Sequence, residues 1–411
     1  MISRYRIAIT GAGIGGLAAA ALLAREGHAV TLVDRFQIPR PLGSGLVVQP
    51  VGMAVLDLLQ AGDQARSLGA PLTRMLGHSG DRVALDVSYR PTQPGFAMHR
   101  AALFHVLWQA MLAAGVAPLT GRTVTGTLET AAGIQLVTGA GALGPFDLVV
   151  DASGAGSALS PLRSRPLAFG AVWAHVPWPE TDLPPDQLRQ RYRSAARMAG
   201  VLPIGRLPDD PAPRAAIFWS LSAAELDAWP TRTLGDWQAE VADFWPAMSP
   251  FLAGLSDKVQ LTPARYSHGS LRRPWTGRLV HIGDAAHRAS PQLGQGANMA
   301  LLDALSLALA LRLPLEDAPR AHLRARRGHL GFYQAMSAAF TPQYQSSSRI
   351  LPWLRDRLLA PLSRVPPLPR VLTAIVSGDI LPPVAGSRFP DLAWTSPSVG
   401  LDFAKTTQET Q

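Results

Sequence analysis

Two spacings of apolar residues alternate along the first part of the chain. A β-branched run at residues 6–10 stops at glycine, and a second apolar run covers 30–33. Between them, an Ala/Leu-rich stretch over 17–25 ends before Gly27. A strand, a helix and a second strand within about 30 residues are typical of a βαβ unit, so we expect parallel strands here. Gly27 is expected just after the helix, where a left-handed residue is common.

Further elements follow the same two patterns. Helical spacing predicts helices over 52–68 and 99–113. An apolar stretch over 299–313 carries Asp303 and Arg312 and is too short for a membrane span, so we expect a buried helix there. Alternating or β-branched runs predict strands at residues 76–89 (as a pair), 135–138, 147–150 and 279–283.

The pattern changes between residues 166 and 263. This stretch is rich in Pro and Trp and has short alternating runs at 171–176, 200–204 and 215–220. Such runs are typical of antiparallel strands rather than βαβ units. Beyond residue 315 the chain is helical in pattern and rich in arginine. The predicted fold class is therefore α/β: a Rossmann-like domain, an inserted mainly antiparallel β-sheet domain and a helical C-terminal region.

Composition restricts the classes of function. The 411 residues are 47% hydrophobic, which is enough for a large core in two or three domains. Basic residues exceed acidic ones by 38 − 29 = 9, but they are scattered and show no nucleic-acid signature, so no nucleic-acid partner is expected. The absence of cysteine excludes disulfides and thiolate metal sites, and we expect no metal. No signal-like segment precedes the first strand, and we expect a cytoplasmic protein.

A glycine-rich turn joins the first predicted strand to the first helix. Gly11, Gly13 and Gly16 fit G-x-G-x-x-G, and Asp34 follows the second strand. Gly11 permits the tight turn, Gly13 allows close approach to a pyrophosphate, and Gly16 allows close packing of helix on strand. The carboxylate of Asp34 can accept hydrogen bonds from ribose hydroxyls. The motif predicts a dinucleotide but does not separate NAD from FAD.

A second motif distinguishes the two cofactors. Gly283 and Asp284 follow a predicted strand, and a loop at 291–298 contains Gly294 and Gly296. The carboxylate can bond a polyol, and the glycines expose N–H groups at the start of the next helix. Such donors suit the pyrimidine edge of a flavin, where reduction places negative charge. NAD has neither a ribityl chain nor that anionic edge, so FAD is predicted.

Together these motifs make the chain similar to class A flavoprotein monooxygenases of the p-hydroxybenzoate hydroxylase fold, over roughly residues 5–380. The resemblance is carried by GAGIGG (11–16), Asp34–Arg35, His99–Arg100 with Leu103, and GDAAHRASPQLGQGANMALLDA (283–304). It implies that Arg100 reaches the FAD pyrophosphate, Asp284 the ribityl chain and Pro291 the flavin face. The cofactor-binding residues predicted in this way are Gly11, Gly13, Gly15, Gly16, Asp34, Arg35, Arg100, Val124, Gly283, Asp284, Pro291, Gly294, Gly296, Ala297 and Asn298.

The change of pattern along the chain also predicts domain boundaries. A discontinuous FAD-binding domain is expected at 1–70, 97–165 and 264–335, a substrate-binding sheet domain at 71–96 and 166–263, a helical region at 336–400 and a flexible tail at 401–411.

One stretch departs from the family pattern. Where the family usually carries an Asp-Gly pair that helps to hold FAD and NAD(P)H, this chain has Ser153–Gly154, and Ser160 stands where arginine is common. Serine can hydrogen-bond but supplies no fixed charge. NADH or NADPH is the expected external reductant. We hypothesise that it acts through a separate flavin reductase, and the alternative is a self-sufficient enzyme.

The family implies hydroxylation or epoxidation through a flavin C4a-hydroperoxide formed with O₂. The inserted sheet would then cover a hydrophobic or aromatic substrate. Its candidate contacts are Tyr192, Phe218, Trp219 and Pro291, with Met198 and Leu202 also near. Phe218 and Trp219 are consecutive on one strand, so only one should face the flavin. No catalytic base is identified, and His287 is interpreted as structural.

Two other functions fit the same motifs: a flavin oxidase or double-bond reductase on a lipid-like substrate, and a non-catalytic binding protein like the GDP-dissociation inhibitors. The segment 340–381 also resembles the C-terminal part of ubiquinone-biosynthesis hydroxylases, because apolar residues such as Trp353 interleave with arginines such as Arg357. It predicts either peripheral membrane contact or a helix that covers the FAD domain.

Overall fold

The computed structural model describes residues 4–38 and 44–385, and its N-terminal part is the predicted βαβ unit. β1 (Arg6–Thr10) and β2 (Ala29–Val33) pair in parallel on either side of α1 (Ile14–Arg25). Gly27 follows the helix with a φ of +90°, as expected. β11 (Leu148–Asp151) and β18 (Leu279–His281) extend the sheet in parallel, and β17 (Trp275–Thr276) adds an antiparallel edge.

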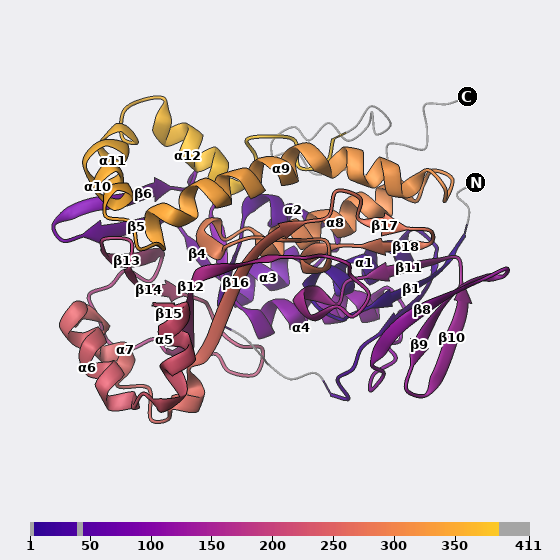
Figure 1. Cartoon of the computed structure of the whole chain (residues 1–411), viewed down its shortest axis with the longest axis horizontal. Coiled ribbons are helices and arrows are strands. Elements are labelled where there is room, and N and C mark those ends of the chain that lie inside the picture. Colours follow the sequence, from indigo (N-terminus) through magenta and orange to yellow (C-terminus); the bar gives the residue numbers. More distant parts are fainter. Residues whose placement is uncertain (1–3, 39–43, 386–411) are drawn as a thin grey trace.

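Three helices pack together beside this sheet (Figure 1). α1 contacts both α4 (Arg100–Ala113) and α8 (Gly296–Ala310). Gly15 permits the close approach of α1 to α8, because a Cβ there would lie 3.3 Å from the Cβ of Ala300. α8 is buried along almost its whole length, including Asp303, which confirms the prediction of a buried helix.

A second, eight-stranded sheet is mainly antiparallel, as predicted. In spatial order it consists of β19 (His287–Arg288), β16 (Thr262–Ser270), β12 (Arg165–Pro177), β15 (Arg214–Ser222), β14 (Arg197–Pro203), β13 (Gln187–Arg193), β5 (Arg74–Ser79) and β6 (Arg82–Ser88). Its single parallel pair, β13 with β5, joins the hairpin at 74–88 to the later strands. The sheet continues past residue 263, the boundary expected from the sequence, because β16 and β19 belong to it.

Short helices cover one face of this sheet and were not predicted. They are α5 (Ala223–Ala228), α6 (Leu234–Phe244) and α7 (Ser249–Leu252). The expected helical stretch over 52–68 is also divided, into α2 (Pro50–Leu58) and α3 (Gly62–Leu68). Gln60, with a φ of +55°, interrupts it, because a left-handed residue cannot continue a right-handed helix.

Two three-stranded sheets complete the β structure. One contains β8 (Val124–Thr130), β9 (Gly133–Thr138) and β10 (Gly141–Phe146); the other contains β3 (Gly45–Val48), β7 (Gly95–His99) and β4 (Ala70–Leu72).

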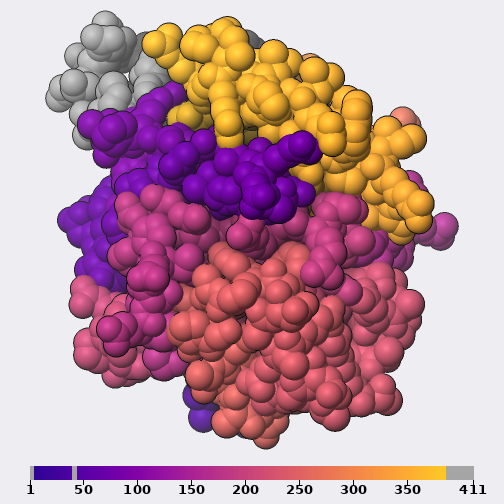
Figure 2. Space-filling view, turned by 90° about the vertical axis from the view of Figure 1, so that its left-hand side faces the viewer, coloured from indigo at the N-terminus to yellow at the C-terminus, as the bar shows by residue number. Residues whose placement is uncertain are grey.

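The C-terminal part is helical, which confirms the predicted fold class. α9 (Ala318–Tyr344) is followed by α10 (Ile350–Leu354), the π-helical turn η7 (Arg355–Leu359), α11 (Ala360–Leu362) and α12 (Leu368–Ser377). Figure 2 shows these later helices in yellow along the upper part of one face. Within 4–38 and 44–385, no helix is both long and apolar enough to cross a membrane. The predicted tail at 401–411 lies outside the described residues.

Candidate functional site

The glycine turn between β1 and α1 is closed by contacts that leave no room for side chains. Gly11 has a φ of +99°, and a Cβ there would lie 2.5 Å from the carbonyl oxygen of Ala152. A Cβ on Gly16 would lie 1.8 Å from the carbonyl oxygen of Gly11. Gly13 differs, because a Cβ there would meet nothing within 4 Å. The turn therefore needs two of its glycines for its own folding and leaves the third facing open space, as a ligand cradle requires.

Two helix N-termini converge beside this turn without side-chain caps. Neither Gly13 at the start of α1 nor Gln295 at the start of α8 makes a side-chain cap bond, and neither first turn contains an acidic residue. The helices lie against each other at Gly15 and Ala300, within a turn or so of both N-termini. Unsatisfied N–H groups and the positive ends of both helix dipoles thus favour an anion at this place. A pyrophosphate and the anionic edge of a reduced flavin fit such a pair of helix ends.

Charged residues of the first motif lie around the same turn. The Asp34 carboxylate accepts hydrogen bonds from the N–H groups of Ala12 (2.6 Å) and Phe36 (3.1 Å), which fixes it beside the glycines. His99 caps α4, since its Nδ1 accepts from the Ala101 N–H at 3.0 Å. Arg100 follows as the first residue of α4 and is exposed.

Two further candidates from the same set lie at the surface or near it. Arg35, directly after Asp34, is exposed, and Val124 is half-buried at the start of β8.

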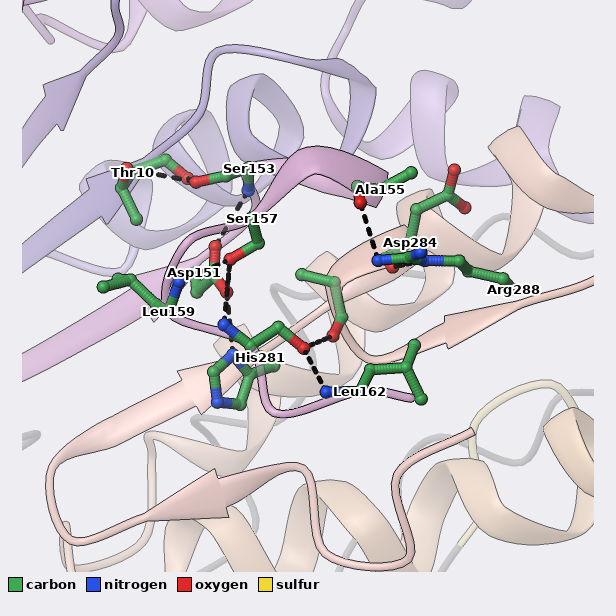
Figure 3. A network of polar contacts seen from close by, with 12 residues as sticks. Thr10, Asp151, Ser153, Ala155, Ser157, Leu159, Leu162, His281, Asp284 and Arg288 are labelled. Carbon is green, nitrogen blue, oxygen red and sulfur yellow. Dashed lines mark hydrogen bonds and ion pairs between the residues drawn. The ribbon is translucent and has the colours of Figure 1, made fainter. Parts of the chain in front are cut away.

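The second motif turns one carboxylate outward. β18 leads into the short 3₁₀ turn η5 (Gly283–Ala285), where Gly283 has a φ of +58°. Asp284 is exposed between two buried residues, and its carbonyl oxygen accepts from Arg288 Nε at 2.9 Å. Its carboxylate makes no hydrogen bond or ion pair to the described residues, and Figure 3 shows none reaching it. It is therefore available to hydroxyl groups of a ligand.

The loop before α8 leaves its backbone open and uses its side chains internally. Pro291, in η6 (Pro291–Leu293), and Gly296 are exposed, and a Cβ on Gly296 would meet nothing within 4 Å. The buried Asn298 side chain accepts from the Gln49 N–H (2.9 Å) and donates to the Val47 carbonyl oxygen (3.1 Å).

Gly294 and Ala297, the remaining predicted residues of this loop, also have their side chains or carbonyl groups in internal contacts or partly buried. The Asn298 amide also donates to the Gly294 carbonyl oxygen at 3.1 Å, and Ala297 is half-buried. Asn298 thus braces the loop, and only the backbone of residues 294–298 is left to face a flavin.

A buried carboxylate organises the stretch that departs from the family pattern (Figure 3). Asp151, at the end of β11, accepts from the Ser153 N–H (3.0 Å) and the Ser157 hydroxyl (2.6 Å), and His281 Nδ1 lies 2.8 Å away. Burial opposes ionisation, but the hydrogen bonds from His281 and Ser157 keep the pKa of Asp151 below its ordinary value. The Ser153 hydroxyl points back to Thr10, at 3.2 Å from its carbonyl oxygen.

A second buried network joins the turn η5 and helix α8 to α9. Asp303 accepts from the Gly283 N–H (3.0 Å) and from Arg326 Nε (2.8 Å), and lies 2.6 Å from His287 Nε2. Met299 Sδ lies 3.2 Å from the same guanidinium. These contacts hold His287 within the buried network. One signal of this network is visible in the sequence, a carboxylate within an apolar helix, but nothing in the sequence indicates its partner in α9.

The substrate candidates divide between the two faces of the large sheet. Trp219 is packed beneath α5–α7, with its ring 5.1 Å from that of Phe244. Phe218 faces the other way and shares a buried cluster with Tyr192 and Met198.

This cluster also reaches α9, since the rings of Tyr192 and Tyr344 are 5.2 Å apart. Leu202 belongs to a neighbouring cluster with Val47, and Pro291 lies apart in η6.

Comparison with known proteins agrees with this geometry. The sequence matches the FAD binding domain family over residues 4–143 and 245–327. AqdB1 of Rhodococcus erythropolis, provisionally named a 2-heptyl-3-hydroxy-4(1H)-quinolone synthase, is 30% identical over 315 residues, which are 74% of this chain and 78% of AqdB1. The 3-hydroxybenzoate 6-hydroxylase of Klebsiella oxytoca is 26% identical over 78% of this chain and 83% of its own.

A solved structure shows the same fold. HpxO of Klebsiella pneumoniae, in complex with FAD and uric acid, matches with a TM-score of 0.76 at 20% identity, over 92% of this chain and 98% of HpxO. The matched family segments contain the glycine turn, Asp284 and the loop at 291–298. The chain therefore belongs to the FAD-dependent aromatic-ring monooxygenases of the p-hydroxybenzoate hydroxylase fold.

Proposed function

We propose that this monooxygenase inserts one oxygen atom from O₂ into a hydrophobic or aromatic small molecule, by hydroxylation or epoxidation. The observation that carries the proposal is the cradle between the N-termini of α1 and α8, with the free carboxylate of Asp284 beside it. Known aromatic substrates among the relatives, such as the hydroxybenzoate of the Klebsiella oxytoca enzyme, support this class of substrate.

Bound FAD would supply the activation of O₂. The chain's own residues would hold it: the N–H groups after Gly13 would donate to the pyrophosphate, Asp34 would accept from the ribose and Asp284 from the ribityl hydroxyls. The backbone of residues 294–298 would donate to the pyrimidine edge, and Pro291 would lie against the ring. The large sheet would exclude water from the flavin site, which protects a reactive intermediate from hydrolysis.

The substrate wall is proposed on the face of the sheet that carries Phe218. Phe218, Tyr192 and Met198 form one buried cluster, and burial raises the pKa of Tyr192 well above its ordinary value, so its hydroxyl stays neutral. Trp219 is left out, because its ring is enclosed beneath α5–α7. A wall of aromatic side chains favours a planar aromatic ring as substrate.

The test is a screen of aromatic compounds with the purified yellow protein, in which O₂ uptake and product mass are measured. A product heavier by one oxygen atom is expected. Oxidation without gain of oxygen would identify an oxidase, loss of a double bond a reductase, and flavin without any turnover a binding protein.

We also propose that FAD is reduced by a separate flavin reductase. NAD(P)H is the usual reductant in the family. Here the Ser153 hydroxyl is directed to Thr10, and the Ser160 hydroxyl donates to the Ala285 carbonyl oxygen at 2.5 Å, so neither presents a charge to a visiting dinucleotide.

Stopped-flow absorbance tests this proposal. Reduction by NADH or NADPH alone is expected to be slow, and an added flavin reductase should restore turnover. Rapid stoichiometric bleaching of the flavin by NADH or NADPH without the reductase would contradict it.

The place of action is a further proposal: a cytoplasmic enzyme in peripheral contact with a membrane. The residues available for that contact are the exposed ones within 349–371, which form α10, η7, α11 and the start of α12.

A further inference from the structure

The exposed side chains of residues 349–371 are of three kinds: apolar, proline and arginine. Seven of the thirteen exposed large hydrophobic residues in the described part of the chain belong to this segment. They are Ile350, Trp353, Leu358, Leu359, Leu362, Val365 and Val371. Ile350 is 75% exposed and Trp353 57%. We call residues 349–371 the C-terminal surface; single exposed apolar residues are common, but a cluster of this kind marks an interaction site.

The charge of this surface has one sign. Its exposed charged residues are Arg349, Arg357, Arg364 and Arg370. The single acidic residue, Asp356, is bound at 2.6 Å by the Nε of the buried Arg355, which neutralises it. The surface therefore combines uncompensated positive charge with exposed apolar side chains.

A buried arginine holds this surface rigidly on the body of the protein. The Arg355 guanidinium lies over the rings of Tyr192 (4.9 Å) and Tyr344 (5.0 Å). It also donates to the carbonyl oxygens of Gln343 (2.7 Å) and Ser194 (3.2 Å). The π-helical turn that begins at Arg355 is a feature often found at functional sites. The exposed apolar residues thus stand on a fixed platform.

Helix α12 connects the C-terminal surface with the loop at 291–298. On one side, the exposed Val371 belongs to the surface. On the other, the Val376 carbonyl oxygen accepts from Gln295 Nε2 at 2.8 Å, at the start of α8. Thr373 fastens the helix to the β5–β6 hairpin through the Ser88 carbonyl oxygen at 2.7 Å, and Figure 2 shows the yellow helices above that hairpin.

We propose that the C-terminal surface binds the anionic face of a lipid bilayer. Apolar side chains leave water when they enter the headgroup region, Trp353 suits the interface, and arginines are attracted to anionic headgroups. A second copy of the chain is a poorer occupant, because a two-fold interface would bring this positively charged surface against the same surface of the other copy. This membrane contact rests on the place of action proposed above, but it depends on neither the substrate nor the reaction. Vesicle binding and monooxygenase activity can therefore fail separately.

Co-sedimentation of the full-length, FAD-loaded protein with vesicles tests this directly. Binding is expected to vesicles of phosphatidylcholine mixed with phosphatidylglycerol, and little to phosphatidylcholine alone. High salt should weaken it, because the attraction of arginine to headgroups is screened. The double variant Trp353→Ser, Leu358→Ser should lose about tenfold or more in partitioning, since two large apolar side chains no longer enter the interface.

A charge variant separates the second contribution. Arg357→Gln with Arg364→Gln should bind the anionic vesicles more weakly and show a smaller salt dependence. Matched controls are Val259→Ser, an apolar residue 81% exposed in the inserted domain, and Arg324→Gln on the exposed side of α9; both should bind as the parent does.

Flavin content and the unfolding midpoint of every variant should equal those of the parent. Absence of binding at low salt, or equal binding by all variants, would overturn the proposal. If Trp353→Ser changes only the oligomeric state in sedimentation velocity, the surface is an interface between copies of the chain, which would overturn it as well.

Discussion

At the scale of residues, the cofactor cradle is supported by buried side chains that would not touch the cofactor themselves. Asp303 gathers the Gly283 N–H, His287 and Arg326 within 3.0 Å of its two oxygens. Burial opposes its ionisation, but the charges of His287 and Arg326 overcome this and hold the pKa of Asp303 far below its ordinary value. Asp303 is thus a buried charge that holds the backbone at Gly283 and so positions the next residue, Asp284.

Asp303→Asn should lower the free energy of unfolding by about 3–5 kcal/mol, because it leaves the buried Arg326 without its counter-charge. Urea denaturation with flavin and far-UV signals measures this. Asp63→Asn is the control: its carboxylate is fully exposed in its pair with Arg66, so the unfolding midpoint should equal that of the parent. Equal midpoints for parent and Asp303→Asn would show that the network is not stabilising.

The three motif glycines should separate folding from cofactor binding. Gly16→Ala places a Cβ against the Gly11 carbonyl oxygen and should destabilise the protein, whereas Gly13→Ala enters open space and should leave the unfolding midpoint of the apoprotein unchanged. The same Cβ would occupy the approach of the pyrophosphate, so FAD affinity of Gly13→Ala should fall by about tenfold or more. Fluorescence titration with FAD measures it; unchanged affinity would place the pyrophosphate elsewhere.

At the scale of elements, local signals determined what could be predicted. The βαβ unit, the buried helix α8 and the strands of the insert follow from spacing along the chain, and the structure confirms them. α5 and α7 were missed because six and four residues are too few to show a helical period. α6 does have a helical spacing, at Leu234, Trp237, Val241 and Phe244, within a stretch that was expected to be sheet. The hydrogen bonds of Asn298 to residues 47 and 49 and the ion pair of Asp303 with Arg326 could not be predicted. Local patterns of polar and apolar residues do not indicate contacts between segments far apart in the sequence.

α9 makes the fold sensitive to acid. Burial lowers the pKa of His322 to about 4 and that of His329 to about 3, from an ordinary value of 6.5. Both are neutral in the folded state near neutral pH, while the unfolded chain takes up protons below pH 6.5. Their stabilisation is therefore complete above pH 6.5 and is lost as the pH falls toward these lowered values.

The expected slope is about 1.4 kcal/mol per pH unit for each histidine. Urea denaturation at several pH values measures it, and His322→Gln should show a shallower slope than the parent. An identical slope would mean that His322 is already protonated in the folded protein.

At the scale of the whole molecule, α9 holds three regions together (Figure 1). Near its start Arg326 pairs with Asp303 of α8, and at its end Tyr344 packs against the large sheet. Arg355 then clamps the C-terminal helices to that same junction.

Arg355→Met should accordingly destabilise the junction by about 3–5 kcal/mol, because it leaves the partly buried Asp356 unpaired. FAD affinity should be unaffected, since the contacts of Arg355 are to Asp356, Gln343, Ser194 and two tyrosines, and none of these lies in the loop at 291–298. The neighbouring Arg357→Met, in an exposed position, is the control and should retain the parent's unfolding midpoint. Limited proteolysis that cuts the C-terminal helices equally in both variants would contradict the clamp.

The two large sheets are both completed by the same late segment of the chain. β16 and β19 finish the eight-stranded sheet, and β17 and β18 finish the parallel one, so both wait for residues 262–288. During synthesis neither sheet can close until that stretch has left the ribosome, and pairings this distant in sequence form slowly. The nascent chain therefore carries two open sheet edges over the same interval and buries them together. Refolding should then proceed as one late cooperative step rather than domain by domain.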